Sequence, residues 1–135
     1  MLGVGQTLPD FKIVGVKPKF MRHEENGESA FETLTKDSFQ GQWKVIFFYP
    51  KDFTFVCPTE IAEFARDLGV LNTEEGVAQR ATFIVDPDNV VQHVYVTNLN
   101  VGRNPQDTLR VLDALQTDEL CPCNRSVGGE TLKAA

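Results

Sequence analysis

The chain has 135 residues, 41% of them hydrophobic, which is enough for one globular domain with a modest core. Its net charge is -6 and its sequence pI is about 4.8, with 13 Lys and Arg scattered along the chain. This balance argues against nucleic acid or an anionic membrane as a partner, because either would require a basic patch.

The sequence does not open with a basic stretch followed by an apolar run, and no segment approaches about 18 apolar residues. We therefore expect no secretory signal and no membrane span, and we predict a cytoplasmic protein. The three cysteines, Cys57, Cys121 and Cys123, are an odd number. That number fits reactive thiols in a reducing compartment better than a disulfide framework.

The first half of the chain predicts a hairpin, a strand and a helix. Residues 11–16 (FKIVGV) and 31–35 (FETLT) are short apolar strands joined by a long charged connection. Residues 43–49 (WKVIFFY) form a near-continuous apolar run, which predicts a central strand buried on both faces. A helix then begins beside Cys57, because Pro58 suits the first helical turn.

The second half predicts another hairpin and another helix. Residues 81–85 and 90–96 flank the turn sequence DPDN, and Asn104 caps a helix that runs to Gln116. Residues 117–135 have no hydrophobic periodicity, so we expect a mobile tail. The whole pattern predicts one α/β domain over residues 1–116, with helices against a mixed sheet, followed by a tail over residues 117–135.

Cys57 is the first candidate for chemistry. A helix N-terminus offers unpaired N–H groups and a positive potential, which favour the reactive thiolate over the thiol. The alternative from position alone is an inert buried cysteine. A thioredoxin-type Cys-x-x-Cys is excluded because Glu60 stands where its second cysteine would be. Thiols in the tail could instead resolve an oxidised Cys57 as a disulfide.

Four segments, in order, resemble the typical two-cysteine peroxiredoxins of the alkyl hydroperoxide reductase C type, in its actinobacterial form. They are FYPKDFTFVCPTE (48–60), QRATFIVDPDN (79–89), VGRNPQDTLRVLDALQ (101–116) and DELCPCN (118–124). The resemblance covers most of the chain. It implies a thioredoxin-like fold, assembly into dimers and rings of dimers, a peroxide substrate, and reduction by a separate dithiol protein. That protein would be thioredoxin-like or an alkyl hydroperoxide reductase partner.

The resemblance also implies roles for four residues around the thiol. Cys57 matches the peroxidatic cysteine, which attacks the peroxide and becomes a sulfenic acid. Thr54 matches the threonine that orients the cysteine and the peroxide, and Pro50 matches the proline that shields the pocket from water. Arg80 matches the arginine that stabilises the thiolate and the breaking O–O bond.

Four further positions have supporting or resolving roles in the family. Glu60 and Arg103 match positions that hold the active-site arginines. Cys121 matches the resolving cysteine, which comes from the partner subunit, and Cys123 matches an extra tail thiol that joins the exchange. We expect no cofactor and no metal. Arg125 departs from the family, which usually has Trp at that position.

The family pattern breaks between Arg66 and Asp67, where two strand and helix units, about fifty residues, are missing. Either the chain is an internal deletion or these residues are omitted from it. In a true deletion, a crossover of about thirty residues could make Val45 and Phe83 neighbours on parallel strands. One side of the sheet would then be exposed.

Other interpretations remain open beside the thiol peroxidase. The gap favours a non-catalytic oligomeric holdase or an inactive, internally deleted fragment, and a redox sensor would pass its disulfide to a partner. Zinc binding by Cys57, Cys121 and Cys123 with a histidine is disfavoured by the tight Cys-x-Cys spacing. His23 lies in a charged loop and His93 within a strand, and we assign neither a chemical role.

Overall fold

A computed structural model describes residues 1–17, 30–50 and 58–133, with side chains described from Glu63 onward in the last range. The elements follow the order β1 (Lys12–Val16), β2 (Phe31–Thr35), β3 (Lys44–Phe47), α1 (Pro58–Asp67), β4 (Leu71–Asn72), β5 (Val77–Ala78), β6 (Arg80–Val85), β7 (Val91–Thr97) and α2 (Pro105–Gln116). No helix among the described residues is long and apolar enough to cross a membrane.

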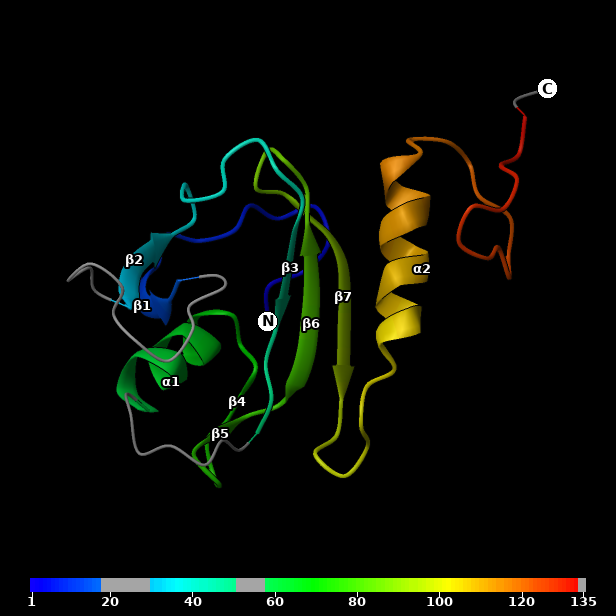
Figure 1. Cartoon of the computed structure of the whole chain (residues 1–135). Helices are drawn as coiled ribbons and strands as arrows, with labels where there is room; N and C mark the ends of the chain where they lie inside the picture. The colour runs from blue at the N-terminus through cyan, green and yellow to red at the C-terminus, as the bar shows by residue number, and fades with distance from the viewer. Residues whose placement is uncertain (18–29, 51–57, 134–135) are drawn as a thin grey trace.

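Both predicted hairpins are confirmed. β1 pairs antiparallel with β2, and β6 pairs antiparallel with β7. The turn between β6 and β7 places Asn89 at a φ of 63°, a left-handed conformation that asparagine tolerates better than most residues. The central sheet has the order β3-β6-β7, and Figure 1 shows α1 on one side of it and α2 beside β7.

The prediction that residues 43–49 form the central, fully buried strand is wrong. β3 is an edge strand of the three-stranded sheet, and the side chains of Val45 and Phe47 are 40% and 60% exposed. The middle strand is β6, whose residues from Ala81 to Val85 are all buried. A continuous apolar run shows that a strand can be covered, but it does not show what covers it.

The predicted parallel pairing of Val45 and Phe83 is also wrong. β3 runs antiparallel to β6, with Val45 opposite Ile84 and Ile46 opposite Phe83. The pairings among the described strands are antiparallel throughout.

The core lies between α1 and the central sheet. The Phe64 ring of α1 lies 4.6 Å from the Phe11 ring and 5.5 Å from the Phe48 ring, between ring centroids. Phe48 in turn meets Phe83 of β6 edge to face at 6.3 Å. The N-terminal segment closes this core, because the backbone N–H of Leu8 donates to Asn89 and the Leu8 side chain is fully buried.

α1 ends in a tight terminator that spans the junction after Arg66. The Val70 N–H donates to the Ala65 carbonyl at 2.8 Å, and the Gly69 N–H donates to the Arg66 carbonyl at 2.9 Å. Gly69 has a φ of 73°, so the three features together form a Schellman motif. Leu68 and Val70 are fully buried beside α1. The sequence on the far side of the junction therefore ends the helix and completes its packing.

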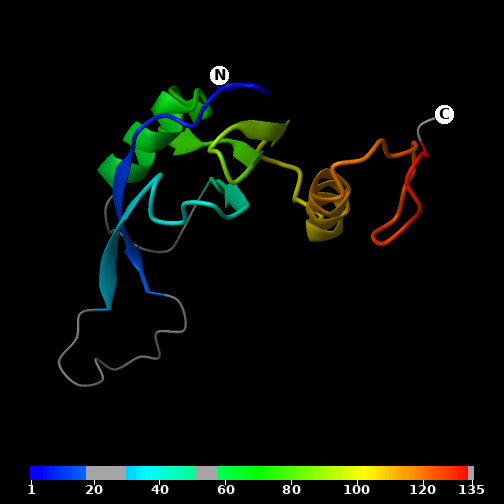
Figure 2. The same ribbon diagram turned by 90° about the horizontal axis from the view of Figure 1, so that it is seen from above.

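α2 and the tail extend from the side of β7. The helix has the predicted bounds, and the side chain of Asn104 accepts from the N–H of Gln106 at its N-terminus. None of its residues is buried, and Leu109 is 49% exposed. Figure 2 shows α2 and the following segment projecting away from the sheet and α1. Within residues 117–133 the tail folds back on itself, with the Leu132 N–H donating to the Leu120 carbonyl at 2.7 Å.

Candidate active site

A pocket of about 320 Å³ opens where β3 ends and β6 begins. Its lining residues come from four parts of the fold and are Tyr49, Pro50, Glu75, Arg80 and Leu99. Pro50 directly precedes the segment that carries Thr54 and Cys57. The structure therefore brings two of the predicted site residues, Pro50 and Arg80, to one cavity.

Arg80 is held at the first position of β6. Its Nε donates to the backbone carbonyl of Leu99 at 2.8 Å, in the loop after β7. The guanidinium group has five N–H donors, and this bond uses one of them. Charge-assisted donors of this kind stabilise a developing negative charge on oxygen.

Arg103 joins the two strands that frame the pocket. Its Nη1 donates to the Phe48 carbonyl and, at 3.1 Å, to the Ala81 carbonyl. Its Cζ atom lies 5.1 Å from the centre of the Phe47 ring, within the range of a cation–π contact. Burial, and secondarily the charge of Arg80, lower the pKa of Arg103. Arg103 thus fixes the backbone beside Pro50 and Arg80, and its role in holding the active-site arginines stays a prediction.

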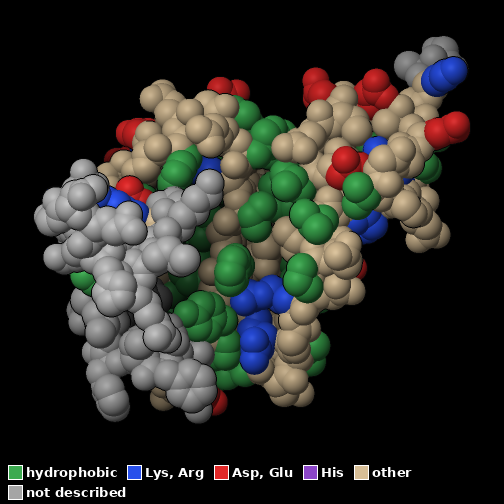
Figure 3. Space-filling view, viewed as in Figure 1, with side chains coloured by type: hydrophobic (Ala, Val, Ile, Leu, Met, Phe, Trp, Pro, Cys, Tyr) green, Lys and Arg blue, Asp and Glu red, His purple; other side chains and the backbone are tan. Residues whose placement is uncertain are grey.

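Arg80 lines the pocket together with Tyr49, Pro50, Glu75 and Leu99, and Arg103 lies over the Phe47 ring. On the face seen in Figure 3, Lys and Arg side chains form a small group bordered by hydrophobic side chains. Apolar surroundings exclude water and so strengthen the interaction between a fixed positive charge and a negative ligand.

Four of the residues singled out in the sequence cannot be placed in this way. Thr54 and Cys57 lie outside the described residues, and so does His23. Glu60 lies in the first turn of α1, but its side chain lies outside the described part. The predicted start of that helix is confirmed, because α1 begins at Pro58, the residue after Cys57.

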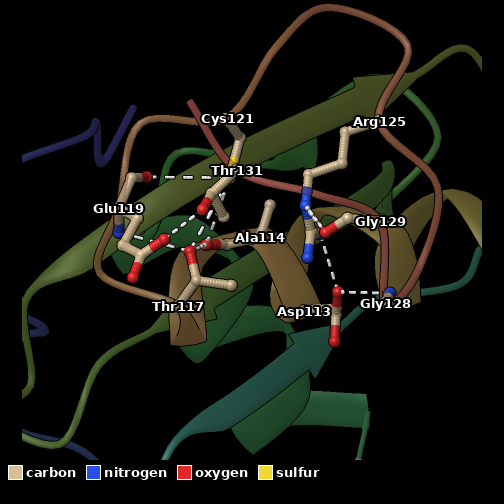
Figure 4. A network of polar contacts seen from close by, with 9 residues as sticks. All are labelled: Asp113, Ala114, Thr117, Glu119, Cys121, Arg125, Gly128, Gly129 and Thr131. Carbon is tan, nitrogen blue, oxygen red and sulfur yellow. Dashed lines mark hydrogen bonds and ion pairs between the residues drawn. The ribbon is translucent and has the colours of Figure 1, made fainter. Parts of the chain in front are cut away.

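The two tail thiols are free and differ in their surroundings. Cys121 is half-buried, whereas Cys123 is exposed. The Sγ atom of Cys121 lies 3.6 Å from the Thr117 Oγ1 and 3.8 Å from the Ala114 carbonyl oxygen (Figure 4). The structure thus places Cys121 against the C-terminal end of α2.

Three pocket residues were missed by sequence reasoning. Tyr49 was assigned to a buried strand, and Glu75 and Leu99 lie in loops that carry no recognisable motif. Glu75 follows a turn in which the Asn72 side chain accepts its backbone N–H at 3.2 Å. A side-chain acceptor two or three residues upstream marks a turn, but no sequence signal tells which cavity that turn faces.

His93 and the possibility of a metal site remain to be considered among the described residues. His93 is half-buried in β7, where burial and then the charge of Arg110 lower its pKa. Within the described ranges, no group of three or more His, Cys, Asp and Glu side chains could hold a metal ion.

Comparisons with known proteins point in one direction. The model of the AhpC/TSA family matches residues 4–67. Alkyl hydroperoxide reductase C of Mycobacterium tuberculosis is 42% identical, with 99% of this chain and 95% of the relative covered. The protein of the same name from Mycolicibacterium smegmatis is 37% identical with the same coverage. The solved structure of Mycobacterium tuberculosis AhpC has a TM-score of 0.72 and 36% identity, covering 92% of this chain and 98% of its own. This likeness confirms the predicted thioredoxin-like α/β fold class.

The alignment also bears on the expected gap. It runs over 187 positions with the Mycobacterium tuberculosis relative, whereas this chain has 135 residues, so about fifty positions have no counterpart here. The match to the family model ends at residue 67, beside the junction predicted between Arg66 and Asp67.

Proposed function

Because the chain belongs to the AhpC/TSA family and is an enzyme of the peroxiredoxin class, we propose that it reduces hydrogen peroxide and organic hydroperoxides with Cys57 as the peroxidatic thiol. The observation that carries this proposal is the pocket that joins Pro50 and Arg80 at the end of β3. The residue that would shield the thiol and the residue that would stabilise charge on oxygen thus share one cavity.

The proposed reaction has two chemical steps. The Cys57 thiolate attacks the terminal peroxide oxygen, the O–O bond breaks, and water or an alcohol leaves as Cys57 becomes a sulfenic acid. The partner's Cys121 then attacks this sulfur, forming a disulfide and releasing water. A separate dithiol protein reduces the disulfide. No cofactor is needed, because the peroxide supplies the oxidising equivalents.

Each supporting residue has a role in these steps. Thr54 would orient the thiolate and the peroxide, while Arg80 donates to the oxygen that gains negative charge. Arg103 keeps the β3 and β6 carbonyl groups in register beside the pocket, and Glu60 would orient the arginines. Cys123 is exposed two residues beyond Cys121, which supports a part for it in thiol exchange with the reductant.

The proposal includes an assembly and a location. An intersubunit disulfide requires at least a dimer, and a ring of dimers follows the family pattern. The odd number of cysteines fits reactive thiols in a reducing compartment, so we place the protein in the cytoplasm.

The test is rapid mixing of the reduced protein with excess hydrogen peroxide, followed by mass spectrometry under non-reducing conditions. We expect fast oxidation and a Cys57–Cys121 crosslink between chains, both lost in Cys57→Ser. In Cys123→Ser the crosslink should persist. Oxidation of the unaltered protein no faster than that of a free thiol would overturn the proposal.

A second candidate function, an oligomeric holdase, is favoured by one observation. Val45, Phe47 and Tyr49 on and beside the edge strand β3 are 40%, 60% and 48% exposed. A surface of this kind can bind other apolar chains. If it does, Val45→Lys should lower the protection of a heat-denatured client protein from aggregation, while peroxide consumption stays unchanged. Equal protection by both proteins would exclude this candidate.

A further inference from the structure

A charged pair fastens the tail to α2. The Arg125 Nη1 donates to the Asp113 Oδ2 at 2.7 Å, and the same carboxylate oxygen accepts the Gly128 N–H at 3.0 Å (Figure 4). The Arg125 side chain is only 5% exposed, and the Asp113 side chain is 34% exposed. Buried and charge-assisted contacts are the kind that hold a segment in one place.

Arg125 also closes the loop that it belongs to. Its Nε donates to the Gly129 carbonyl at 3.0 Å, and the Gly129 N–H donates to the Ser126 carbonyl at 2.9 Å. Gly128 has a φ of 72°, which a side chain would resist. One guanidinium therefore binds both the helix and the turn of the tail, so the tail cannot leave α2 without breaking the ion pair.

Cys121 lies in the segment between the end of α2 and the fastened loop, and its own contacts are with that end of the helix. The thiol lies within 3.6 Å of the Glu119 carbonyl oxygen and 3.8 Å of the Ala114 carbonyl oxygen, and it can donate to either. The Thr117 hydroxyl donates to the same Ala114 carbonyl at 2.7 Å, and its oxygen lies 3.6 Å from the Cys121 sulfur. These contacts leave the sulfur only partly accessible, so release from them would ease the approach of another sulfur, which must come to about 2.05 Å in a disulfide.

We propose that Asp113 and Arg125 are positioning residues for Cys121: their ion pair keeps the thiol docked on α2, and its opening sets the rate at which Cys121 is released for disulfide formation. The ion pair links α2 to the segment that follows Cys121. Its loss would therefore free that segment and the thiol together. The effect on disulfide formation rests on the proposed function, in which Cys121 is the resolving cysteine. The docking of Cys121 on α2 does not depend on that function.

The charge state of the pair supports this role. The Gly128 N–H, and then Arg125, lower the pKa of Asp113. The carboxylate is therefore ionised at neutral pH, where the exchange of thiols and disulfides would take place.

The first experiment measures docking alone. In a Cys57→Ser, Cys123→Ser background only Cys121 reacts with iodoacetamide, and its alkylation rate reports how often it is released. Asp113→Asn keeps an oxygen acceptor of the same shape and removes only the charge. We expect alkylation to be about five- to tenfold faster than in the parent. Asp107→Asn, which removes a carboxylate from the first turn of α2, should leave the rate unchanged.

Two further variants separate positioning from general loss of structure. Arg125→Ala should accelerate alkylation as Asp113→Asn does, and Arg125→Lys, which keeps the charge, should restore part of the protection. Far-ultraviolet circular dichroism should show unchanged helix content in all variants. An alkylation rate in Asp113→Asn equal to that of the parent would overturn the proposal, as would equal acceleration by Asp107→Asn.

The second experiment links docking to the reaction. With Cys57 present, Asp113→Asn should form the Cys57–Cys121 disulfide faster after peroxide is added, while the rate of Cys57 oxidation stays the same. An unchanged disulfide rate despite faster alkylation would overturn the link to catalysis. If Cys57 is not oxidised at all, the proposed function fails, while the alkylation result still decides whether the tail is docked as described.

Discussion

One guanidinium group, that of Arg103, holds the end of β3 against the start of β6. It donates to the Phe48 and Ala81 carbonyls and lies over the Phe47 ring. Lysine offers a point charge without the planar fork, so it can serve one carbonyl at a time. The position of Pro50, two residues after Phe48, therefore depends on this particular side chain.

We expect Arg103→Lys to slow Cys57 oxidation by hydrogen peroxide about tenfold and to lower the free energy of unfolding by about 1–2 kcal/mol. The loss arises because one of the two carbonyls bonded by Arg103 loses that charged donor. Stopped-flow oxidation and urea unfolding measure the two effects. Arg110→Lys, on the exposed surface of α2, is the matched control and should change neither.

Glu75 places a negative charge in the wall of the same pocket. Two unit charges about 4 Å apart in water repel by about 1 kcal/mol, so a hydroperoxide that carries a carboxylate should be disfavoured. We expect Glu75→Gln to raise the rate with such a substrate about fivefold and to leave the rate with hydrogen peroxide unchanged. The neighbouring Glu74→Gln should alter neither rate. Equal effects on charged and uncharged peroxides would show that Glu75 does not select substrates.

At the scale of elements, the charge of Arg110 on α2 affects the protonation of His93 on β7. Burial, and to a smaller degree Arg110 on α2, lower the pKa of His93 from 6.5. The folded chain then binds this proton less readily than the unfolded chain, so stability is complete above about pH 6.5 and falls as the pH drops below it. The contribution is below about 1 kcal/mol, because the ring is partly solvated.

We therefore expect His93→Gln to flatten the decline in stability between about pH 7 and about pH 5. Thermal unfolding followed across that range gives the measurement. An identical slope in the variant and the parent would show that His93 has the same proton affinity in the folded and the unfolded chain.

The terminator of α1 depends on one glycine. A Cβ atom at Gly69 would lie 2.6 Å from the Met1 Cα, and the residue has a φ of 73°. We expect Gly69→Ala to cost about 2–3 kcal/mol of stability, from backbone strain together with the displaced N-terminus. Gly76 has a similar φ of 67°, but a Cβ atom there would meet open space. The smaller cost expected for Gly76→Ala therefore gives the backbone strain without the displacement of the N-terminus. Urea unfolding of both variants gives the comparison.

At the scale of the whole molecule, local signals predicted the elements better than their partners. Pro58, the DPDN turn and Asn104 each determine structure within a few residues, and α1, the second hairpin and α2 lie where these signals put them. The apolar run at 43–49 predicted a strand correctly but its place wrongly, because pairing depends on residues elsewhere in the chain. The tail shows the same limit: Arg125 and Asp113 are 12 positions apart, and no periodic pattern announces their contact.

The candidate site divides in the same way. The motif around Cys57 identified Pro50, and a later segment identified Arg80, which lies with it in the pocket. Glu75 and Leu99 join them only because the β4–β5 turn and the loop after β7 fold to the same end of the sheet. Sequence reasoning therefore identified the residues expected to act on a peroxide, but not the complete wall that would select among peroxides.

The Schellman motif at the end of α1 also allows the junction after Arg66 to be tested in solution by hydrogen exchange. The amide hydrogen of Val70 is bonded to Ala65 across the junction predicted between Arg66 and Asp67. If Leu68, Gly69 and Val70 directly follow this helix in the folded protein, that hydrogen should exchange with deuterated solvent as slowly as those of β6. A chain with intervening residues would present a different amide at that carbonyl. The exchange rate of the Val70 amide proton thus tests whether Leu68, Gly69 and Val70 directly follow α1 in the folded protein.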